Sequence, residues 1–169
     1  MPRPPALVVG VISDTHGLMR PEALDALAGS THILHAGDIG GPEILDALAA
    51  IAPVTAVRGN NDRGPWAERL SARTTVTLAG HRILVLHDRG ELDPDPRALT
   101  NLSAVVTGHS HRPAIERRDG VLFLNPGSAG PRRFSVPITL ARLIVAGERL
   151  EAELVPLAIP PTPARRKKG

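Results

Sequence analysis

Residues 6–16 read ALVVGVISDTH, an apolar run that ends in the polar cluster Asp14-Thr15-His16. A short, continuous apolar run of this kind is typical of a buried β-strand. Asp14 and His16 lie two residues apart, so in a chain that is still extended they point to the same side just past the strand. This stretch therefore predicts a strand that delivers a carboxylate and an imidazole to the edge of a sheet.

Four further polar clusters follow apolar runs in the same way. They are Gly37-Asp38, Gly59-Asn60-Asn61-Asp62, His87-Asp88 and Gly108-His109-Ser110-His111. Ligands of α/β proteins collect at the carboxyl ends of the strands, where the loops diverge. We therefore expect all five clusters to gather at one edge of a single sheet.

Strands and helices alternate in the first part of the chain. Strands are predicted at residues 6–12, 32–35 and 54–57, and helices at residues 21–28 and 42–51. Pro21 suits the first turn of a helix, and Gly29 suits its end. This alternation predicts parallel strands joined by right-handed crossovers.

The second part is rich in strands and is expected to be partly antiparallel. The strand candidates are residues 74–78, 83–86, 104–106, 114–117, 121–124, 138–145 and 150–157, with one short helix near residues 96–101 and hairpin turns at 118–120 and 146–148. Together the two parts predict an α/β fold, a four-layer α/β/β/α sandwich of two mixed sheets flanked by helices. We expect a single domain over residues 1–159 and a disordered basic tail over residues 160–169.

The composition excludes several classes of site. The 169 residues include no cysteine, so disulfides, thiolate metal sites and cysteine nucleophiles are excluded. Only 2% of the residues are aromatic, which argues against a stacking surface for nucleic acid, and the net charge of +3 comes largely from residues 165–168. The first apolar run is too short to span a membrane. We expect a soluble cytoplasmic protein of unknown oligomeric state.

The clusters hold the donors that a pair of divalent cations requires. They supply two aspartates, one asparagine and four of the seven histidines, namely Asp14, Asp38, Asn60, His16, His87, His109 and His111. Any one cluster is as compatible with an ordinary turn as with a ligand, and the joint occurrence favours a metal site. Gly37 lets the chain turn tightly before Asp38, whose two carboxylate oxygens make it the candidate ligand shared by both ions.

The five ordered blocks resemble those of the calcineurin-like metallophosphoesterases. The short length and the later Asn125-Pro126-Gly127-Ser128 narrow the resemblance to the small YfcE-type phosphodiesterases, over about residues 6–156. The resemblance implies a metallo-dependent phosphatase-like fold and two divalent metal ions, with manganese expected and iron, zinc or nickel as alternatives. It implies that one ion is held by Asp14, His16, Asp38 and His111, and the other by Asp38, Asn60, His87 and His109.

Two positions depart from the pattern of the family. Relatives usually have His-Gly-His in the fourth block, whereas Asp88 and Arg89 follow His87 here. Many larger phosphatases have a histidine that assists the leaving group where this chain has Asn61. Asparagine cannot deliver a proton, so the general acid is open, with Asp62 and Asp88 as alternatives.

We predict phosphodiester hydrolysis of a small phosphate ester by a metal-bridging hydroxide, with His109, Asp38 and Asn60 as catalytic residues. Hydrolysis of a phosphomonoester is an alternative, and so is a non-catalytic scaffold resembling the retromer subunit of this fold. A decayed scaffold site should have lost ligands, and all seven positions carry coordinating side chains. Lesser candidates are His35 as a partner orienting a ligand, residues 125–128 near a phosphate, and Arg132 and Arg133 as a phosphate clamp. His32 and His81 are expected to flank strands or face the surface.

Overall fold

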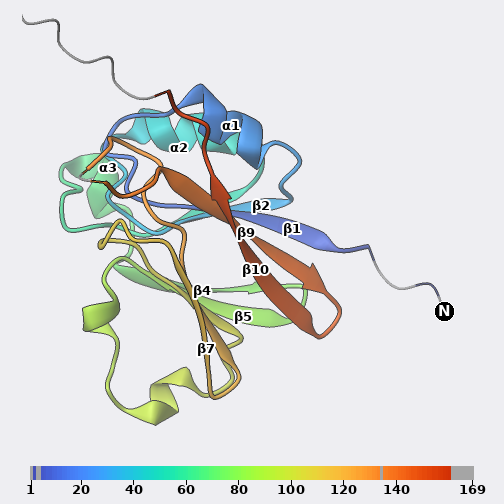
Figure 1. The fold of residues 1–169 in the computed structure, drawn as a ribbon. Helices are drawn as coiled ribbons and strands as arrows, with labels where there is room; N and C mark the ends of the chain where they lie inside the picture. The colour runs from blue at the N-terminus through green and yellow to red at the C-terminus, as the bar shows by residue number, and fades with distance from the viewer. Residues whose placement is uncertain (1, 3–4, 134, 161–169) are drawn as a thin grey trace, which may run out of the picture.

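Two five-stranded sheets stack face to face in the computed structural model, which describes residues 2, 5–133 and 135–160 (Figure 1). The first sheet has the order β10-β9-β1-β2-β3 and the second has the order β4-β5-β6-β8-β7. The strands of the first sheet are β1 (Leu7–Ile12), β2 (His32–His35), β3 (Val54–Ala56), β9 (Thr139–Ala146) and β10 (Arg149–Pro156). Those of the second are β4 (Arg73–Leu78), β5 (His81–Leu86), β6 (Ala104–Val106), β7 (Ala114–Arg118) and β8 (Val121–Asn125).

Both sheets are mixed, as predicted. Strands β1, β2 and β3 are parallel, while β9 and β10 continue the first sheet in antiparallel pairs. In the second sheet β5, β6 and β8 are parallel, and β4 and β7 are antiparallel edge strands. The carboxyl ends of the parallel strands of each sheet therefore lie at a common edge.

The helices lie mainly on one side of the sandwich. Helices α1 (Pro21–Leu27), α2 (Pro42–Ala49) and the short α3 (Pro65–Glu68) pack against the first sheet, away from the second (Figure 1). Two short 3-10 helices, η1 (Arg89–Glu91) and η2 (Pro96–Leu99), belong to the segment that covers the outer face of the second sheet. The predicted four-layer arrangement is confirmed, with a thin outer layer on this side. The sequence prediction missed α3 and η1.

Side-chain alternation along the strands separates the hydrophobic layers. Val9 and Val11 of β1 point between the two sheets, where they pack with residues such as Val85 and Val106. Ile12 instead points to the helices and contacts a cluster that includes Leu27. Each fully buried side chain of this size contributes about 1.5–3 kcal/mol, so the alternation fixes which face of each strand is inward and hence where its terminal loop emerges.

No helix among the described residues is long and apolar enough to cross a membrane. The predicted tail falls almost wholly on residues 161–169, which lie outside the described residues. The tail, the domain boundary at residue 159 and the cytoplasmic location stay predictions.

Candidate metal centre

All seven predicted ligand residues follow the carboxyl ends of strands, as expected. The expectation that these strands belong to a single sheet is wrong, because the residues come from both sheets. Asp14 and His16 follow β1, Asp38 follows β2, Asn60 follows β3, His87 follows β5, and His109 and His111 follow β6. The loops are joined by main-chain hydrogen bonds. Asp14 N–H donates to Gly37 O (3.0 Å) within the first sheet's loops, and Gly108 N–H donates to His87 O (2.9 Å) within those of the second.

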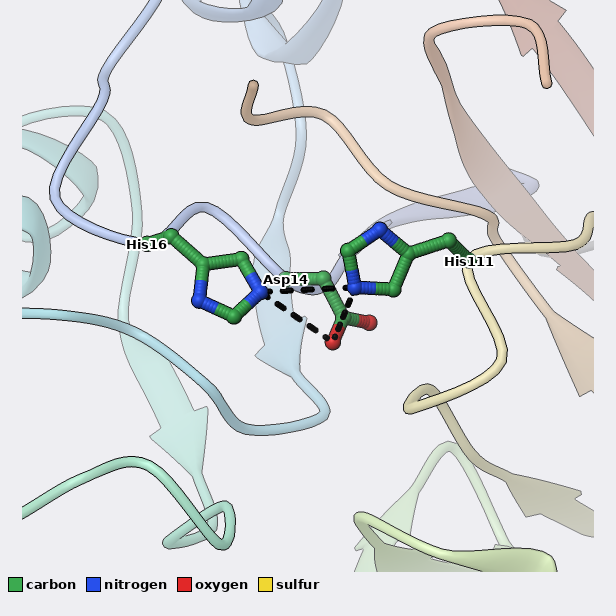
Figure 2. A group of neighbouring side chains, drawn as sticks. All are labelled: Asp14, His16 and His111. Atoms are coloured by element: carbon green, nitrogen blue, oxygen red, sulfur yellow. Dashed lines mark hydrogen bonds and ion pairs between the residues drawn. The ribbon is translucent and has the colours of Figure 1, made fainter. Parts of the chain in front are cut away.

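Asp14, His16 and His111 form a compact group of donor atoms (Figure 2). Asp14 Oδ1 lies 3.3 Å from His111 Nε2 and 3.9 Å from His16 Nε2, and the two Nε2 atoms lie 3.3 Å apart. The three atoms lie within 4.8 Å of one another, so a single cation can contact all of them. This group contains three of the four residues predicted for the first ion. The fourth, Asp38, has its Oδ2 3.8 Å from His16 Nε2.

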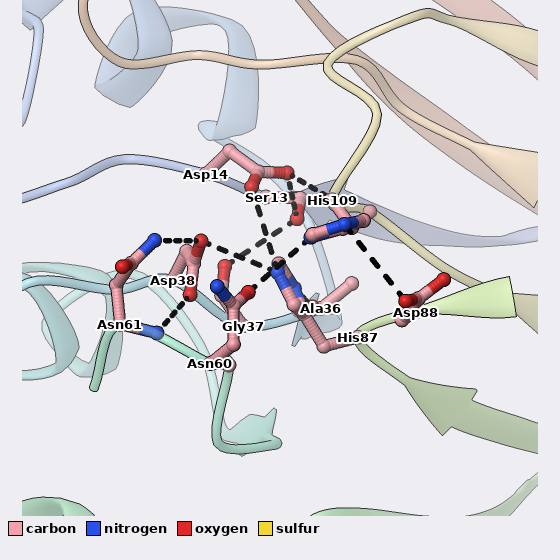
Figure 3. Close-up of polar contacts among 12 residues, drawn as sticks. Ser13, Asp14, Ala36, Gly37, Asp38, Asn60, Asn61, His87, Asp88 and His109 are labelled. Atoms are coloured by element: carbon pink, nitrogen blue, oxygen red, sulfur yellow. Dashed lines mark hydrogen bonds and ion pairs between the residues drawn. The ribbon is translucent and has the colours of Figure 1, made fainter. Parts of the chain in front are cut away.

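Asp14, Asp38 and His87 form the second group (Figure 3). His87 Nε2 lies 3.3 Å from Asp38 Oδ2 and 3.9 Å from Asp14 Oδ1. Asp38 Oδ2 thus faces one histidine from each predicted ligand set, His16 and His87. Asp14 also reaches into both groups, which the assignment by resemblance did not include.

Asn60 and His109 lie at the exposed rim of the centre. His109 Nδ1 is 3.2 Å from Asn60 Oδ1, and the His109 ring packs edge-on against His87 with 5.1 Å between ring centroids. Both rim residues are solvent-exposed, whereas Asp14, Asp38, His87 and His111 are buried. The centre therefore has a buried floor and an open side.

Unsatisfied buried atoms indicate that the floor is suited to a cation. Among the described residues, three buried side-chain atoms have no hydrogen-bond partner: Asp14 Oδ1, His87 Nε2 and His111 Nδ1. The first two belong to the groups of donor atoms described above. Buried polar atoms are normally paired, because an unpaired one costs about 1–3 kcal/mol. On the other side of its ring, His87 Nδ1 lies 2.7 Å from Ala36 O, a contact that places the proton on Nδ1 and leaves the Nε2 lone pair for a metal. The donors are oxygens and imidazole nitrogens, a set that manganese, iron, zinc and nickel accept.

Burial and neighbouring polar groups shift the pKa values of the floor residues. Burial raises the pKa of Asp14, an effect that outweighs the opposing influence of the Ser13 hydroxyl and the nearby histidines. For Asp38, burial alone would raise the pKa, but His87 and the donors of Asn61 together hold the pKa well below its ordinary value. Burial lowers the pKa of His87, yet Asp38, the Ala36 carbonyl and Asp14 together raise it above the ordinary value. A proton on His87 thus offsets carboxylate charge in the position where a bound cation would do so.

The backbone at the centre is strained. Asp14, His16, Asp38, His109 and His111 all have positive φ angles, between 45° and 69°. Non-glycine residues rarely adopt this conformation, and such residues cluster at functional sites where the surrounding structure enforces it. The extended geometry expected for Asp14 and His16 is therefore wrong in detail. The chain turns sharply at each of these residues, and the turns aim the two side chains at the centre.

The buried carboxylate of Asp62 holds two of these loops together. Its Oδ1 accepts hydrogen bonds from the N–H groups of Ile39 (2.9 Å) and Gly40 (3.0 Å), and its Oδ2 accepts one from Gly59 N–H (2.9 Å). All three donors are N–H groups, so Asp62 acts as an acceptor that joins the loops after β2 and β3. This removes Asp62 as a candidate general acid.

Residues 7–148 match the family model of the calcineurin-like phosphoesterase superfamily domain. The chain belongs to this superfamily. A probable metallophosphoesterase of Methanothermobacter thermautotrophicus is 36% identical over 167 residues, covering 91% of this chain and 95% of the relative. A probable metallophosphoesterase of Methanocaldococcus jannaschii is 32% identical over 164 residues, covering 89% and 82%. The resemblance seen in the sequence blocks is confirmed.

Solved structures show the same phosphoesterase fold at lower identity. Vacuolar Protein Sorting 29 from Cryptosporidium parvum matches with a TM-score of 0.76 and 22% identity, covering 90% of this chain and 92% of that chain. A structure described as a novel archaeal phosphodiesterase matches with a TM-score of 0.72 and 20% identity, covering 89% and 100%. The phosphoesterase Yfce from E. coli matches with a TM-score of 0.62 and 22% identity, again covering 89% and 100%. These likenesses confirm the predicted phosphatase-like fold.

Several residues that support this phosphoesterase site were missed or only lightly weighed in the sequence. Asn125 Nδ2 donates to Gly108 O (2.9 Å) and Ser110 Oγ (3.1 Å), and Ser128 Oγ donates to Asp14 O (2.9 Å). Residues 125–128 therefore connect the loop that carries Asp14 with the loop that carries His109 and His111. His35 is fully buried: its Nδ1 accepts from Gly37 N–H (3.1 Å), and its Nε2 lies 3.0 Å from Thr15 Oγ1, which donates to Ile39 O (2.8 Å). In the sequence, only the Asn125-Pro126-Gly127-Ser128 motif and the position of His35 at a strand end pointed to these roles.

Two cavities flank His109 at the open side. One, of about 410 Å³, is lined by His109, His111, Arg112, Arg133, Val136 and Pro137 among others. The other, of about 230 Å³, is lined by Asp88, Arg89, His109, Glu116, Phe123 and Leu124 among others. The first is cationic and the second combines apolar surface with charges of both signs. Arg132 lines a much smaller adjoining space, so of the two arginines considered as a phosphate clamp, Arg133 is the one at the large cavity.

Proposed function

We propose that this protein is a metal-dependent phosphoesterase with a dinuclear centre. One cation would be held by Asp14, His16, Asp38 and His111, and the other by Asp38, Asn60, His87 and His109. The observation that carries the proposal is the pair of buried, unpartnered donor atoms, Asp14 Oδ1 and His87 Nε2, within a set of seven coordinating side chains. Mixed oxygen and nitrogen ligands suit manganese, with iron, zinc and nickel as alternatives.

The buried residues and the residues at the exposed rim have different roles in the proposed reaction. Two bound cations would polarise the phosphoryl oxygens of the substrate and lower the pKa of a water molecule. Asp38 Oδ2 lies near one histidine of each ligand set, His16 and His87, so this carboxylate can contact both cations. Asn60 contributes a neutral amide oxygen at the rim. His109 is exposed at the open side, where it can contact the phosphoryl group and offset its charge.

Phosphodiesters are the proposed substrate class. Asn61 occupies the position from which a histidine would assist the leaving group, and its side-chain amide donates to Asp38 Oδ2 (2.8 Å). An amide cannot deliver a proton, which disfavours the dianionic monoester and its poor leaving groups. A diester carries a single charge that two cations offset more fully. The two cavities on either side of His109 offer a place for each of its two substituents.

The cavities also favour different substituents. Arg112 and Arg133 line the larger cavity. Burial is the main cause that lowers the pKa of His111, and the charge of Arg133 adds to this effect. We propose that an anionic or strongly polar substituent is bound there. The smaller cavity, with Phe123 and Leu124 in its lining, suits an apolar or aryl substituent.

Steady-state kinetics on a matched pair tests this proposal. With manganese, an aryl phosphodiester should be cleaved faster than the corresponding aryl monoester, and a chelator should abolish both activities. Asp38→Asn serves as the control for contaminating phosphatase, because it should lose most of both activities. A monoester preference of tenfold or more, about 1.4 kcal/mol in barrier, would show that another group acts as the acid. Purified protein without metal and without activity would instead support the scaffold alternative.

A further inference from the structure

His109 has different neighbours at its two ring nitrogens (Figure 3). Its Nδ1 lies 3.2 Å from Asn60 Oδ1 on the side of the metal centre. Its Nε2 lies 3.8 Å from Asp88 Oδ2, on the side away from Asn60. A carboxylate thus faces the outer nitrogen of a residue whose inner nitrogen faces the second proposed cation. This separation is too long for a direct hydrogen bond, so the carboxylate acts on the ring through its charge.

Asp88 is fixed in this position by its own loop. Its Oδ1 accepts a hydrogen bond from Gly90 N–H (2.8 Å), which caps the start of η1. The adjacent Arg89 is engaged elsewhere, because it pairs with Glu116 (3.1 Å) and its guanidinium lies over the Phe123 ring at 4.6 Å. Oδ2 of Asp88 is therefore left to face His109.

We propose that Asp88 is a positioning residue that orients His109 and strengthens it as a metal ligand. The proposal rests on the dinuclear centre proposed above. A neutral imidazole can offer its Nδ1 lone pair only when the proton is on Nε2. A carboxylate beside Nε2 favours that tautomer, limits rotation of the ring and makes Nδ1 a stronger donor.

The effect should be confined to one of the two cations. His109 belongs to the outer ligand set with Asn60, whereas Asp14, His16 and His111 form a separate group with no contact to Asp88 in the described structure. Loss of a carboxylate that orients a metal-bound histidine typically lowers metal affinity about 10–100-fold. A general loss of negative charge would instead weaken both sites slightly and alike.

Calorimetric titration of the metal-free full chain with Mn²⁺ tests the proposal. In Asp88→Asn the amide oxygen can still accept from Gly90 N–H, so the η1 cap is retained while the charge is removed. We expect one of the two Mn²⁺ sites to lose about 10–100-fold in affinity and the other to stay unchanged. Asp88→Glu should recover part of the loss. Glu91→Gln, an exposed carboxylate of the same 3-10 helix, is the matched charge control and should leave both sites unchanged.

The outcomes separate this inference from the proposed function. If the wild type binds two Mn²⁺ ions and Asp88→Asn matches Glu91→Gln at both sites, the role of Asp88 is overturned while the dinuclear centre stands. If Asp88→Asn weakens one site but no phosphoester is hydrolysed, the role of Asp88 stands and the proposed activity falls. Fewer than two Mn²⁺ ions bound by the wild type would overturn both.

Discussion

Asn61 holds the carboxylate of Asp38 with two hydrogen bonds, one from its backbone N–H to Oδ1 (2.9 Å) and one from its side-chain Nδ2 to Oδ2 (2.8 Å) (Figure 3). The residue thus has a positive role at this site, in addition to lacking a transferable proton. The backbone of the neighbouring Gly59 lies so close to Asp38 that a β-carbon at that position would collide with the Asp38 backbone nitrogen and Oδ1. The loop that follows β3 therefore fixes the position of the Asp38 carboxylate through two hydrogen bonds and a close backbone contact.

Removal of the Asn61 side chain should weaken metal binding. Asn61→Ala loses the bond to Oδ2 and keeps the backbone bond to Oδ1, so Asp38 stays in place but gains rotational freedom. A hydrogen bond to a charged group contributes about 1.5–3 kcal/mol, and we expect at least a tenfold loss in Mn²⁺ affinity and in kcat/KM. Calorimetry and diester kinetics measure the two effects. Arg63→Ala, an exposed neighbour in the same loop, is the control, and equal affinities in the two variants would contradict the clamp.

Asp38 and Asn60 should differ in how many ions they control. If Asp38 is the ligand shared by both ions, Asp38→Asn removes charge from both sites, whereas Asn60→Ala disturbs one. We expect the bound metal per chain to fall further in Asp38→Asn. Elemental analysis of both variants after dialysis decides the question. If both variants retain the same amount of metal per chain, Asp38 is not the shared ligand. Asp14, which also belongs to both groups, is then the candidate for that role.

His35 should make the metal-free protein less stable at mildly acidic pH. Burial lowers the pKa of His35 to about 3, whereas its ordinary value is 6.5. The unfolded chain takes up a proton below pH 6.5 and the folded chain does not, so stability is full above pH 6.5 and falls as the pH drops toward 3. Each pH unit in this window costs up to about 1.4 kcal/mol, or about 2 kcal/mol at pH 5. Urea unfolding with chelator at pH 7.5 and 5.0 measures the change.

The variant His35→Gln isolates this contribution. It removes the titrating group, so its unfolding free energy should change less between the two pH values than that of the wild type. The raised pKa of His87 acts in the opposite direction, because it favours the folded state at low pH. That effect is common to both proteins and cancels in the comparison. Identical pH dependence in both would show that His35 is not responsible.

Cations should stabilise the fold, and Asp14 should be needed for the effect. A cation at 100 times its dissociation constant adds about 2.7 kcal/mol to the folded state. In Asp14→Asn we expect this increment to vanish, while the metal-free melting temperature is equal to or above that of the wild type, because a buried carboxylate with a raised pKa is no longer present. Differential scanning calorimetry with Mn²⁺ or chelator tests both statements. A marked fall in the metal-free melting temperature of Asp14→Asn would contradict this view of the buried floor.

The sequence predicted the elements that depend on local pattern. Apolar runs such as residues 6–12 and 83–86 predicted strands correctly, because strands buried on both faces are apolar throughout. Helix α3 was not predicted, because Pro65–Glu68 is a single turn and is too short to show a helical pattern of apolar residues. His81, expected to flank a strand or face the surface, begins β5 and is buried, with its ring nitrogens 3.1 Å from Ser103 Oγ and 2.8 Å from Gly147 O. The second contact exists only once the hairpin of β9 and β10 folds back.

The same limit applies to the candidate site. The ligand residues could be named because polar clusters directly follow apolar strands, whose carboxyl ends collect ligands in α/β folds. That the strand ends of two sheets meet at the site was not predicted. The supporting roles of Asn61, Asp62 and Asn125 depend on which loop packs on which, and neighbouring sequence does not encode that. Asp62 was considered as an acid because Asn61 cannot deliver a proton, but in the fold it accepts hydrogen bonds from the backbone N–H groups of three loop residues.

Because the ligand residues come from both sheets, they are synthesised at different times, and this determines when the metal centre can form during translation. Residues 14–60 of the ligand set are synthesised first, but His109 and His111 follow only after β6, and β9 must still be added beside β1. Until residues 139–146 emerge, β1 has an unpaired edge directly before the loop that carries Asp14 and His16. Metal binding on a nascent chain is therefore expected late in folding, because a chain that ends before β9 has every ligand residue but lacks the two strands that complete the first sheet beside β1.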